Sequence, residues 1–482
     1  MIACAPPPVL FQGRRWSADQ LAGMAAGWRH ILQARWPPSP GPLAMVMLND
    51  PQSVALFFAL SAFPVPLILL PLDLEPWGNP PLPRDTRLVL TPTLGHLDAE
   101  ASQLGIAVTV LPESEAPSPS PTDPPSMAMP GVVVFTSGST GLPRPVYRRT
   151  TALLHAARTL MGAVGPPGGG GIIATLPLAQ MFGLNHGLLA ASILGAPLAL
   201  VRRFDHRVVL GLFASREWRY WAGTPMMADV LSRCPLPGPH PAPPACVIGG
   251  HVSADLARCF AERFGVPLRG AYGTTEVGTV TVDAVAAADV DSRTAGRPLP
   301  GVDLRVGDDP RRPGPAGTLG RIWLSSPETL MEGYGFPAHL EPPATVDGWW
   351  ATPDVGHVDP LGRLTLEGRL DDCFRTDAGH VVSPGAVAAA LEGYPGLADV
   401  AAVALATAAG PVLGVLVESA GRVDAAELRR HLSRSLPSWS QPRVIEATVA
   451  LPRLSNGRPD RRACIAWLEK ALGAGISGDR EG

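Results

Sequence analysis

The stretch that most constrains this chain runs from Val132 to Arg148 and reads VVVFTSGSTGLPRPVYR. Its first part, Val132–Phe135, is β-branched or aromatic, a composition that predicts a buried strand. The loop that follows, Thr136–Gly141, carries four hydroxyl side chains and two glycines. Glycine lets neighbouring backbone N–H groups turn toward a common point, so such a loop can hold an anion such as a triphosphate. Arg144 follows shortly and adds a cation within reach.

Two interpretations of this loop are open from its residues alone. The pattern G-x-x-x-x-G-K-[ST] of the common mononucleotide-binding loop is absent, so the fold of ordinary ATPases is not indicated. A loop rich in serine and glycine is, taken by itself, more often a plain turn between strands. The choice between a turn and a phosphate site therefore depends on the rest of the chain.

The composition restricts the classes of protein to which the chain can belong. With 482 residues, 46% of them hydrophobic, it exceeds one ordinary domain and can bury a large core. A formal net charge of −3 argues against binding to nucleic acids or to a membrane surface. Lys470 is the only lysine, and arginine supplies the other strong bases. This bias bears on positions where lysine would be expected.

Cysteine spacing and the lack of targeting patterns predict a cytoplasmic protein with reduced thiols. No basic region followed by an apolar run opens the chain, and prolines interrupt the apolar segment Phe57–Leu72, so we expect neither a signal peptide nor a membrane span. The cysteines are scattered without a C-x-x-C pair, which favours free thiols over disulfides or a zinc site. They are Cys4, Cys234, Cys246, Cys259, Cys373 and Cys464.

Alternating helical and strand patterns between residues 14 and 110 predict a parallel sheet with helices on both faces. The expected helices are Trp16–Leu32, with Ser17 as N-cap, and Gln52–Phe63. The expected strands are Leu43–Leu48, Leu67–Leu70 and Thr86–Leu90. Pro112–Pro130 is rich in proline and serine and is expected to form a surface loop.

Further along, the patterns predict more α/β structure and then a small α+β domain at the C-terminus. Thr151–Met161 has the pattern of a helix and Ile172–Leu176 that of a strand. The elements expected in the C-terminal part are helices at Pro384–Leu391 and Ala425–Leu436, with strands near Val400–Leu405 and Val412–Val417.

The segment Thr136–Pro143 resembles the phosphate-binding signature T-S-G-[ST]-T-G-x-P-K of the adenylate-forming ligases. This superfamily includes acyl- and aryl-CoA synthetases, the adenylation domains of peptide synthetases and firefly-type luciferases. Arg144 stands where the family has lysine, and further matches follow in the family's order over nearly the whole chain. The resemblance implies that the triphosphate is bound by Thr136, Ser137, Gly138, Ser139, Thr140, Gly141 and Arg144.

A second match, AYGTTE at residues 271–276, resembles the family motif Y-G-x-T-E. It implies that Tyr272 stacks on adenine, that Thr275 reaches the α-phosphate, and that Glu276 holds Mg²⁺ between the phosphates. In the family, paired glycines such as those in VIGGH at residues 247–251 let adenine and the acyl group lie against the backbone. The residues expected at the nucleotide are Gly249, Gly250, Ala271, Tyr272, Gly273, Thr274 and Thr275.

The segment PLAQMFGL at residues 177–184 resembles P-[LM]-x-H-x-x-G-[LF], which flanks the carboxylate-binding pocket in the family. Gln180 takes the histidine position and cannot be protonated. An alternative is that this segment merely begins a helix and packs its apolar side chains into the core. The substrate pocket is expected to include Gln180, Phe182, His251 and Gly278, although a lone histidine is usually an ordinary satisfied polar residue. An acidic residue suited to hold an α-amine is not evident, which weighs against an amino-acid substrate.

Two later segments resemble the family's ribose-binding and hinge motifs. GWWATPDVG at residues 348–356 matches G-W-x-x-T-G-D-x-G except for Pro353, and implies that Asp354 accepts from both ribose hydroxyls. EGRLDD at residues 367–372 resembles G-R-x-[DK]-D, so Arg369 is expected at ribose and phosphate, and Asp371 at the hinge about which the small domain rotates after adenylation. The alternative for the linker carboxylates is a solvated turn. Gly379 would line the channel for the acceptor thiol.

The last match, LPRLSNGRPDR at residues 451–461, resembles L-P-[RK]-T-x-x-G-K-[IV]-x-R, and Arg458 takes the place of the catalytic lysine. In the family that lysine stabilises negative charge as the substrate carboxylate attacks phosphorus. Arginine keeps the charge but differs in bulk and planarity. One hypothesis is that the active site has adjusted to a chain nearly free of lysine. The other is that adenylation is lost and a binding scaffold remains. We favour an active enzyme because Thr275, Glu276, Asp354 and Arg369 are all present.

These patterns combine into one expectation. The fold is α/β, with a large N-terminal domain of stacked αβ subdomains and a β-rich subregion (residues 1–370), and a small, mobile α+β domain on a hinge (residues 371–482). The function is an ATP- and Mg²⁺-dependent ligase that activates a carboxylic acid, preferably aromatic, and passes it to coenzyme A or to the phosphopantetheine of an acyl-carrier protein. Aryl-acid ligases of bacterial pigment or polyketide pathways are the expected subfamily. A fatty-acyl-CoA ligase is the alternative within the same class, and Thr275, Glu276 and Arg458 are the catalytic candidates.

Overall fold

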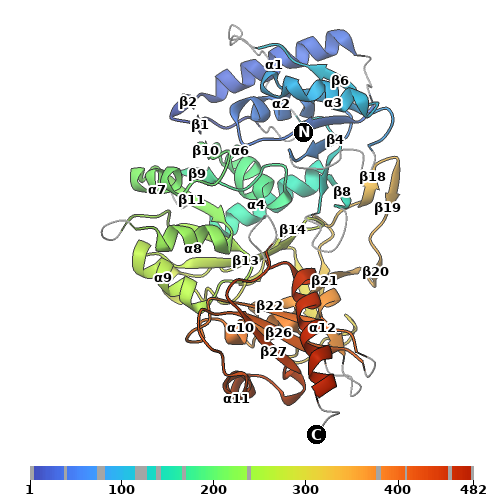
Figure 1. Ribbon diagram of the computed structural model, residues 1–482. Helices are drawn as coiled ribbons and strands as arrows, with labels where there is room; N and C mark the ends of the chain where they lie inside the picture. The colour runs from blue at the N-terminus through green and yellow to red at the C-terminus, as the bar shows by residue number, and fades with distance from the viewer. Residues whose placement is uncertain are drawn as a thin grey trace. The chain divides into compact units, whose positions relative to one another are not determined.

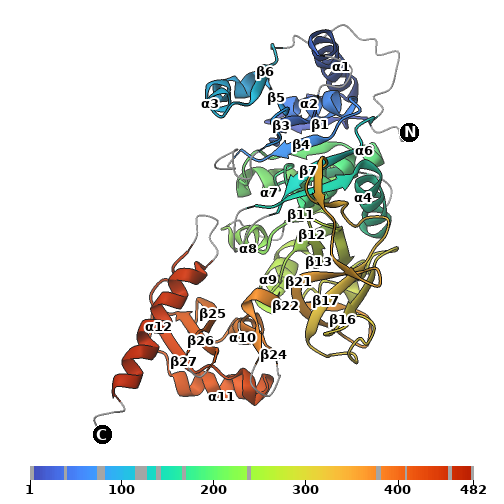
Figure 2. The same cartoon turned by 90° about the vertical axis from the view of Figure 1, so that its right-hand side faces the viewer.

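The computed structural model describes residues 5–36, 41–72, 82–113, 127–136, 143–165, 170–235, 240–375, 381–407, 410–453 and 459–478. Its contacts divide the chain into two compact units. Unit 1 consists of Met1–Asp303 and Ser325–Thr345, and unit 2 of Leu304–Leu324 and Val346–Gly482. Figure 1 and Figure 2 show both units with their elements labelled.

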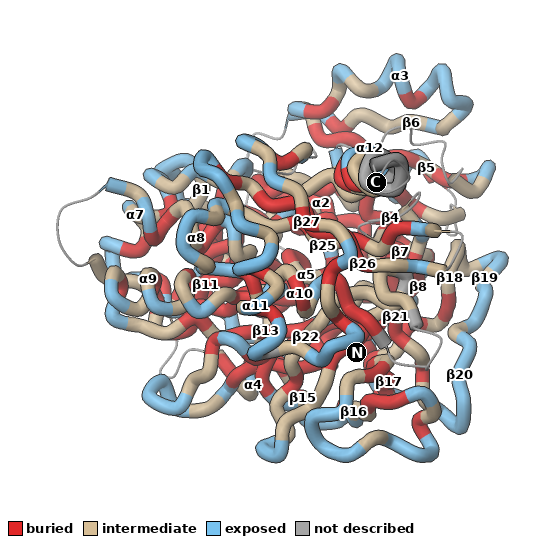
Figure 3. The backbone as a smooth tube through the Cα atoms, turned by 60° about the horizontal axis from the view of Figure 1, so that its bottom comes forward, coloured by how far each residue is buried: buried red, intermediate tan, exposed pale blue. Residues whose placement is uncertain are grey.

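One of the two large sheets of unit 1 has eight strands. Its central strands run parallel, while the edge made by β18, β19 and β8 is antiparallel. The order is β19 (His339–Glu341), β18 (Gly333–Phe336), β8 (Pro145–Arg149), β7 (Gly131–Phe135), β4 (Leu67–Leu70), β3 (Leu43–Val46), β5 (Arg87–Leu90) and β6 (Ala107–Val110). The strands β3, β4 and β7 are buried along their whole length, as parallel strands covered on both faces are (Figure 3).

The other large sheet of unit 1 has nine strands, with a parallel centre and antiparallel strands at both edges. The order is β15 (Arg297–Pro298), β14 (Gly278–Val282), β13 (Leu268–Thr274), β12 (Ala245–Gly249), β11 (Trp218–Gly223), β9 (Gly171–Ala174), β10 (Leu198–Leu200), β1 (Val9–Phe11) and β2 (Arg14–Trp16). Helix α4 (Thr150–Val164) contacts strands of both sheets and lies between them (Figure 1). The predicted parallel α/β arrangement is confirmed, with antiparallel edges added.

Several helices of unit 1 begin at a residue whose side chain caps them. Ser17 caps α1 by accepting from Gln20 N at 3.1 Å, and the Gln20 side chain accepts from Ser17 N in return. The predicted N-cap at Ser17 is therefore confirmed. The remaining helical segments are α1 (Ala18–Arg35), α2 (Pro51–Ser61), a 3₁₀ turn (Pro92–Leu97), α3 (Asp98–Gln103), α5 (Met181–Gly183), a π-helix (Leu184–Leu189), α6 (Ala190–Leu194), α7 (His206–Ser215), α8 (Pro225–Arg233), α9 (Ala254–Phe264) and a 3₁₀ turn (Ala287–Asp289).

Asn49, in the segment that follows β3, joins the two sheets. Its amide nitrogen donates to Leu176 O at 2.9 Å and to Val201 O at 3.1 Å, and its oxygen accepts from Leu178 N at 2.9 Å. These partners follow strands of the nine-stranded sheet, whereas β3 belongs to the eight-stranded one. Asn49 is 4% exposed, so each of these bonds replaces one to water. The residue therefore fixes the segment that leads to Gln180.

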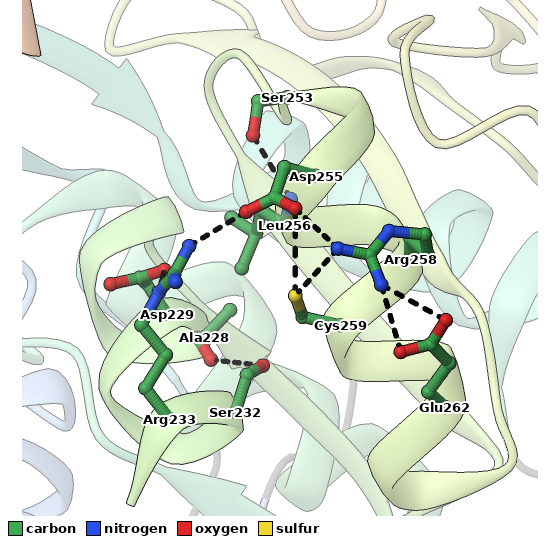
Figure 4. A network of polar contacts seen from close by, with 10 residues as sticks. All are labelled: Ala228, Asp229, Ser232, Arg233, Ser253, Asp255, Leu256, Arg258, Cys259 and Glu262. Atoms are coloured by element: carbon green, nitrogen blue, oxygen red, sulfur yellow. Dashed lines mark hydrogen bonds and ion pairs between the residues drawn. The ribbon is translucent and has the colours of Figure 1, made fainter. Parts of the chain in front are cut away.

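Helices α8 and α9 are joined on the surface by a chain of ion pairs (Figure 4). The Arg233 guanidinium binds Asp229 on its own helix at 2.6 Å and Asp255 on α9 at 2.8 Å. Arg258 contacts the same Asp255 at 2.6 Å and also Glu262. Hydrogen bonds from the two arginines hold the pKa of Asp255 below its ordinary value. Because these groups are exposed, we assign them to holding the two helices in register rather than to a large share of stability.

Unit 2 contains a five-stranded sheet and a three-stranded sheet. The first has β22 (Leu364–Arg369) paired to β21 (Trp349–Val358), with the remaining order β16 (Asp303–Val306), β17 (Gly320–Ser325), β21, β20 (Thr345–Val346). The second is β25 (Asp399–Leu405), β26 (Val412–Glu418) and β27 (Val444–Thr448), with β27 parallel to β26. The other elements are a 3₁₀ turn (Leu370–Asp372), β23 (Phe374–Arg375), β24 (Val381–Val382), α10 (Pro384–Leu391), α11 (Ala425–Ser435), a 3₁₀ turn (Ser438–Ser440) and α12 (Arg461–Gly478).

The predicted helices and strands of the C-terminal α+β part are confirmed to within one residue at each end. Five cysteines lie among the described residues, and all five are free thiols, as the spacing predicted. Within the described ranges, no helix combines the length and apolar character that a membrane crossing requires. The predicted surface loop Pro112–Pro130 lies mostly outside the described residues.

Candidate functional site

The predicted phosphate loop follows β7 and precedes β8, two adjacent antiparallel strands of unit 1. Its two ends are held together, because Thr136 N donates to Arg144 O at 3.0 Å and Arg144 N donates to Thr136 Oγ1, also at 3.0 Å. The strand predicted at Val132–Phe135 is confirmed as the body of β7. The expected phosphate ligands Ser137, Gly138, Ser139, Thr140 and Gly141 lie outside the described residues.

Arg144 contacts two side chains of the neighbouring strands β18 and β19. Its guanidinium carbon lies 3.7 Å from the ring centroid of Tyr334, a cation–π distance. It also pairs with Glu341 at 3.3 Å, but both of these side chains are more than half exposed. The ion pair is therefore weak, and the guanidinium is held mainly by the ring.

The hairpin of β13 and β14 carries the motif at residues 271–276. Since β13 ends at Thr274 and β14 begins at Gly278, Thr275 and Glu276 lie in the turn. The turn is fixed by Thr274 Oγ1, which accepts from Val277 N at 3.1 Å. The two candidate catalytic residues of unit 1 thus sit on a short, bonded turn at the end of a buried strand.

Glu276 is held both by its backbone and by its carboxylate. Its carbonyl accepts from Met331 N at 2.7 Å, and its Oε1 accepts from the Tyr334 hydroxyl at 2.9 Å. The residue is 8% exposed. A nearly buried carboxylate with one oxygen bonded to a neutral phenol is suited to bind a cation through its second oxygen.

The glycines expected at the nucleotide lie beside this hairpin. Gly249, the last residue of β12, pairs with Ala271 of β13. Gly250 follows with φ +119°, a conformation that favours glycine, and its N–H donates to Ala271 O at 3.4 Å. Tyr272 is 6% exposed, and a Cβ on Gly273 would come within 2.6 Å of the backbone opposite. The structure therefore brings these expected nucleotide-binding residues together at one end of adjacent strands.

The expected acyl-pocket residues are only partly assembled by the described contacts. Phe182 lies against Gly249, since a Cβ on that glycine would meet the Phe182 ring at 3.0 Å. Gln180 and His251 are exposed, while Met181 is buried in agreement with the alternative of a helix start packed into the core. Gly278 lies at the start of β14 with φ +91°. Phe182 is the member of this set whose position against the nucleotide glycines is best defined.

A π-helix directly after Phe182 turns polar side chains into the core of unit 1, and single π-turns are frequent at functional sites. His186 Nδ1 lies 2.6 Å from the Tyr220 hydroxyl and its Nε2 lies 2.8 Å from Thr279 Oγ1. Its ring also packs on Phe182, with centroids 4.0 Å apart. Burial lowers the pKa of His186 to about 3. The imidazole is therefore neutral at physiological pH.

The buried neutral imidazole predicts a loss of stability at mildly acidic pH. Below about pH 6.5 the unfolded chain protonates His186 and the folded chain does not, so the unfolding free energy falls by up to about 1.4 kcal/mol per pH unit from this residue. Urea unfolding measured from about pH 7 to about pH 5 checks this in the wild type and in His186→Gln, which has no group that titrates there. The same pH slope in both proteins would contradict the assignment.

Arg148 and Asn185 form a second buried polar group that the sequence patterns did not single out. Arg148 is fully buried, and its NH2 donates to Val277 O at 2.7 Å and to Thr329 O at 2.6 Å. Burial lowers its pKa to about 9, with Glu276 opposing, so it remains a cation at neutral pH. A Cβ on Gly278 would come within 2.8 Å of Asn185 Nδ2 and 3.0 Å of Arg148 NH1. Arg148 thus supports the residue that follows Glu276.

In unit 2, the expected ribose-binding residues face each other across two strands. Asp354 of β21 is in register with Arg369 of β22, and the carboxylate lies 3.8 Å from the guanidinium. Thr352 Oγ1 donates to Ile322 O at 2.9 Å and accepts from Asp354 N at 3.1 Å. Pro353 thus lies inside a continuous strand, and the carboxylate after it is held in place.

The segments predicted to hold the hinge, the thiol channel and the catalytic cation are described only in part. Asp371 lies in a 3₁₀ turn, but its side chain is outside the description, as are Gly379 and Arg458. Arg453 and Pro459, the described residues on either side of this part of the chain, form an isolated β-bridge. These three expected residues therefore remain predictions.

The described donor sets fit ATP and Mg²⁺. Glu276 offers a carboxylate beside the hydroxyls of Thr274 and Thr275, and Mg²⁺ is commonly bound by one or two carboxylates together with phosphate oxygens and water. In unit 2, Arg369 Nε is buried without a hydrogen-bond partner, a donor that a ribose or phosphate oxygen could satisfy. No cluster of three or more His, Cys, Asp or Glu side chains suited to a metal occurs in the described parts of the chain, so a site made only of protein ligands is not indicated there.

Comparison with known proteins found relatives that are named as acid ligases. A salicylyl-CoA synthase / salicylate adenylyltransferase from a Streptomyces species is 28% identical over 69% of this chain and 62% of its own length. A fatty acid–[acyl-carrier-protein] ligase, ScoC of Streptomyces coeruleorubidus, is 32% identical over 40% of this chain and 38% of its own. The match thus spans less than two thirds of either relative.

Among solved structures, ATP-bound MatB from Rhodopseudomonas palustris superimposes with a TM-score of 0.79, covering 97% of this chain and 96% of that one at 20% identity. At this identity the likeness concerns the fold, and it agrees with the predicted large N-terminal and small C-terminal parts. The profile of the family described as AMP-binding enzyme matches residues 43–335, which is more than half of the chain. The chain belongs to the AMP-binding enzyme family, that of the adenylate-forming acid ligases.

Proposed function

We propose that this chain is an ATP- and Mg²⁺-dependent ligase that activates a carboxylic acid and transfers the acyl group to a thiol. In the first step a carboxylate oxygen attacks the α-phosphorus, and pyrophosphate leaves to give the acyl-AMP. In the second step a thiolate attacks the acyl carbon, and AMP leaves. The observation that carries this proposal is the turn at Thr274–Glu276. It follows the strand in which Ala271 lies beside Gly249 and Gly250, and Glu276 is held in it by one hydrogen bond to its carboxylate and one to its backbone carbonyl.

The proposed roles in unit 1 follow from this turn. The ring of Tyr272 and the glycine backbone would receive adenine, and Thr275 would donate to the α-phosphate. Glu276 would hold Mg²⁺, which supplies positive charge against the phosphate oxygens. The loop at residues 136–141 with Arg144 would bind the outer phosphates, since its two ends are already joined by hydrogen bonds.

The proposed roles in unit 2 concern ribose and catalysis. Asp354 would accept from the ribose hydroxyls, and Arg369 would donate to ribose and phosphate. Arg458 would stabilise the charge that develops as the carboxylate attacks. We further propose that residues 1–370 and 371–482 act as two domains, with Asp371 as the hinge and Gly379 in the thiol channel.

The preferred substrate class is an aromatic acid. The Phe182 ring lies against Gly249, and an aromatic substrate could pack against this ring. The similarity to a salicylate-activating enzyme supports the same class. A fatty acid is the second candidate, supported by the similarity to a fatty acid–[acyl-carrier-protein] ligase. The acceptor would be coenzyme A or an acyl-carrier protein, the thiols named for these two relatives.

ATP/pyrophosphate exchange against benzoates, cinnamates, fatty acids and amino acids tests the proposal. We expect exchange with aromatic acids and none with amino acids. Exchange with fatty acids alone would replace the aromatic assignment by the second candidate. If no acid supports exchange although ATP still binds, a binding scaffold would be favoured. Such a scaffold would have lost adenylation because arginine replaces the family's lysine at position 458. Adding coenzyme A or a carrier protein to the active acid then identifies the acceptor.

A further inference from the structure

Tyr334 touches both charged groups that flank the proposed phosphate site of unit 1. Its hydroxyl donates to Glu276 Oε1 at 2.9 Å, and its ring lies under the Arg144 guanidinium at 3.7 Å. Sequence motifs place Arg144 and Glu276 at the nucleotide, yet neither motif includes Tyr334. One side chain therefore links the cation after the phosphate loop to the carboxylate proposed for Mg²⁺.

The position of Tyr334 is fixed by strands on both sides. β18 pairs with β8, where Tyr334 is opposite Val146, and with β19, where it is opposite Glu341. A phenol is protonated at neutral pH and a carboxylate only accepts, so the Tyr334 hydroxyl is the donor in its bond to Glu276.

The aromatic ring of Tyr334 is important because residue 144 is an arginine and not the lysine that is usual in the family. A guanidinium is planar and weakly hydrated, so it stacks on an aromatic face, whereas a lysine ammonium is a compact and strongly hydrated charge. Among the described residues, the Arg144 side chain otherwise forms the exposed pair with Glu341, which sits opposite Tyr334 on β19. The tyrosine ring is therefore the stronger of the two supports for the guanidinium.

We propose that Tyr334 is a positioning residue that sets both groups at once. Its ring holds Arg144 where the phosphate loop ends, and its hydroxyl occupies one oxygen of Glu276 so that the other is presented to Mg²⁺. This inference rests on the proposed function, because it assigns the orientation of groups at the same site. It also predicts that arginine at position 144 depends on the ring, which lysine would not need.

The test separates the hydroxyl from the ring. Tyr334→Phe removes the hydroxyl alone, and we expect the Mg²⁺ concentration for half-maximal binding of ATP to rise about 10-fold, the size of one hydrogen bond to a charged group. Tyr334→Leu removes both features, and ATP affinity at saturating Mg²⁺ should fall about 5-fold further from the loss of the cation–π contact. Arg144→Lys should weaken ATP binding in the wild type but have no effect in the Tyr334→Leu background.

Glu341→Gln is the matched control, because it removes the ion pair of Arg144 and leaves the ring in place. We expect ATP affinity within about 2-fold of the wild type. Unchanged Mg²⁺ dependence in Tyr334→Phe would overturn the inference. Additive effects of Arg144→Lys and Tyr334→Leu on ATP binding would overturn it as well. So would an effect of Glu341→Gln as large as that of Tyr334→Leu.

Binding is measured by calorimetry with ATP and Mg²⁺, without acid or thiol. The inference can therefore fail while pyrophosphate exchange succeeds. It can also hold in a protein that exchanges with no acid, which would remove the ligase proposal and keep the nucleotide site. Thermal unfolding of each variant identifies any that are globally destabilised, and for these the comparison between Phe and Leu at position 334 is repeated at lower temperature.

Discussion

Replacing Glu276 by glutamine is expected to lower ATP/pyrophosphate exchange by about 10²-fold or more, because the substitution removes the charge that would hold Mg²⁺. Glutamine has the same size, and its amide oxygen can still accept from Tyr334 at the place where Oε1 accepts now. The backbone bond from Met331 is unaffected as well. The substitution should therefore leave the unfolding free energy almost unchanged while the reaction slows.

The measurement compares exchange rates over a range of Mg²⁺ concentrations. Glu332→Gln serves as control, since Glu332 lies close to Tyr334 in sequence and its carboxylate forms a partly exposed ion pair with Arg149. We expect this control to keep its activity within about 2-fold. If Glu276→Gln exchanged at the wild-type rate, the carboxylate would have no role at the metal and the turn would be structural only.

Replacing Arg458 by alanine is expected to slow acid-dependent pyrophosphate release by at least about 10²-fold, because it removes the cation proposed to stabilise the attacking carboxylate and the α-phosphate. Described residues on both sides of this position have fixed partners. Arg453 forms a β-bridge with Pro459 and binds Asp399 and Glu418, each at 2.8 Å. Asp460 N also donates to Pro452 O at 2.7 Å.

Two further variants sharpen the Arg458 experiment. Arg458→Lys restores the residue usual in the family, and a rate at or above the wild type would indicate that charge, not the guanidinium shape, is what the reaction needs. Arg462→Ala removes an exposed arginine from the first turn of α12 and should leave the rate within about 2-fold. An unchanged rate in Arg458→Ala would show that Arg458 is not the activating cation.

The parts of the fold that follow from local patterns were predictable from the sequence. α10, α11, β25 and β26 match the expected ranges closely because their apolar residues repeat at helical or strand spacing and because caps such as Ser383 and Asp424 mark the helix starts. Ser17 and the β7 strand are further examples. Such signals lie within a few residues of each other, so no knowledge of the tertiary structure is needed.

The contacts that build the site are of a different kind. Arg148 bonds to carbonyls that lie 129 and 181 residues away, and Tyr334 reaches Glu276 across 58 residues. No local spacing encodes these pairs, since they depend on the pairing of β18 with β8. His186 could have drawn attention as a histidine inside an apolar helical run, but its partners Tyr220 and Thr279 come from two separate strands. The sequence motifs identified the charged groups of the site. The residues that hold those groups in place became visible only in the structure.

The chain enters unit 2 first at Leu304–Leu324 and again at Val346, and this path limits how the protein can be divided into fragments. A fragment beginning at Val346 would keep β21 without β17, its neighbour in the sheet. The long strand β21 would then expose a row of unpaired backbone groups, a template for aggregation. Fragments for separate expression should therefore begin beyond this sheet, or should carry residues 304–324 grafted back onto the C-terminal piece.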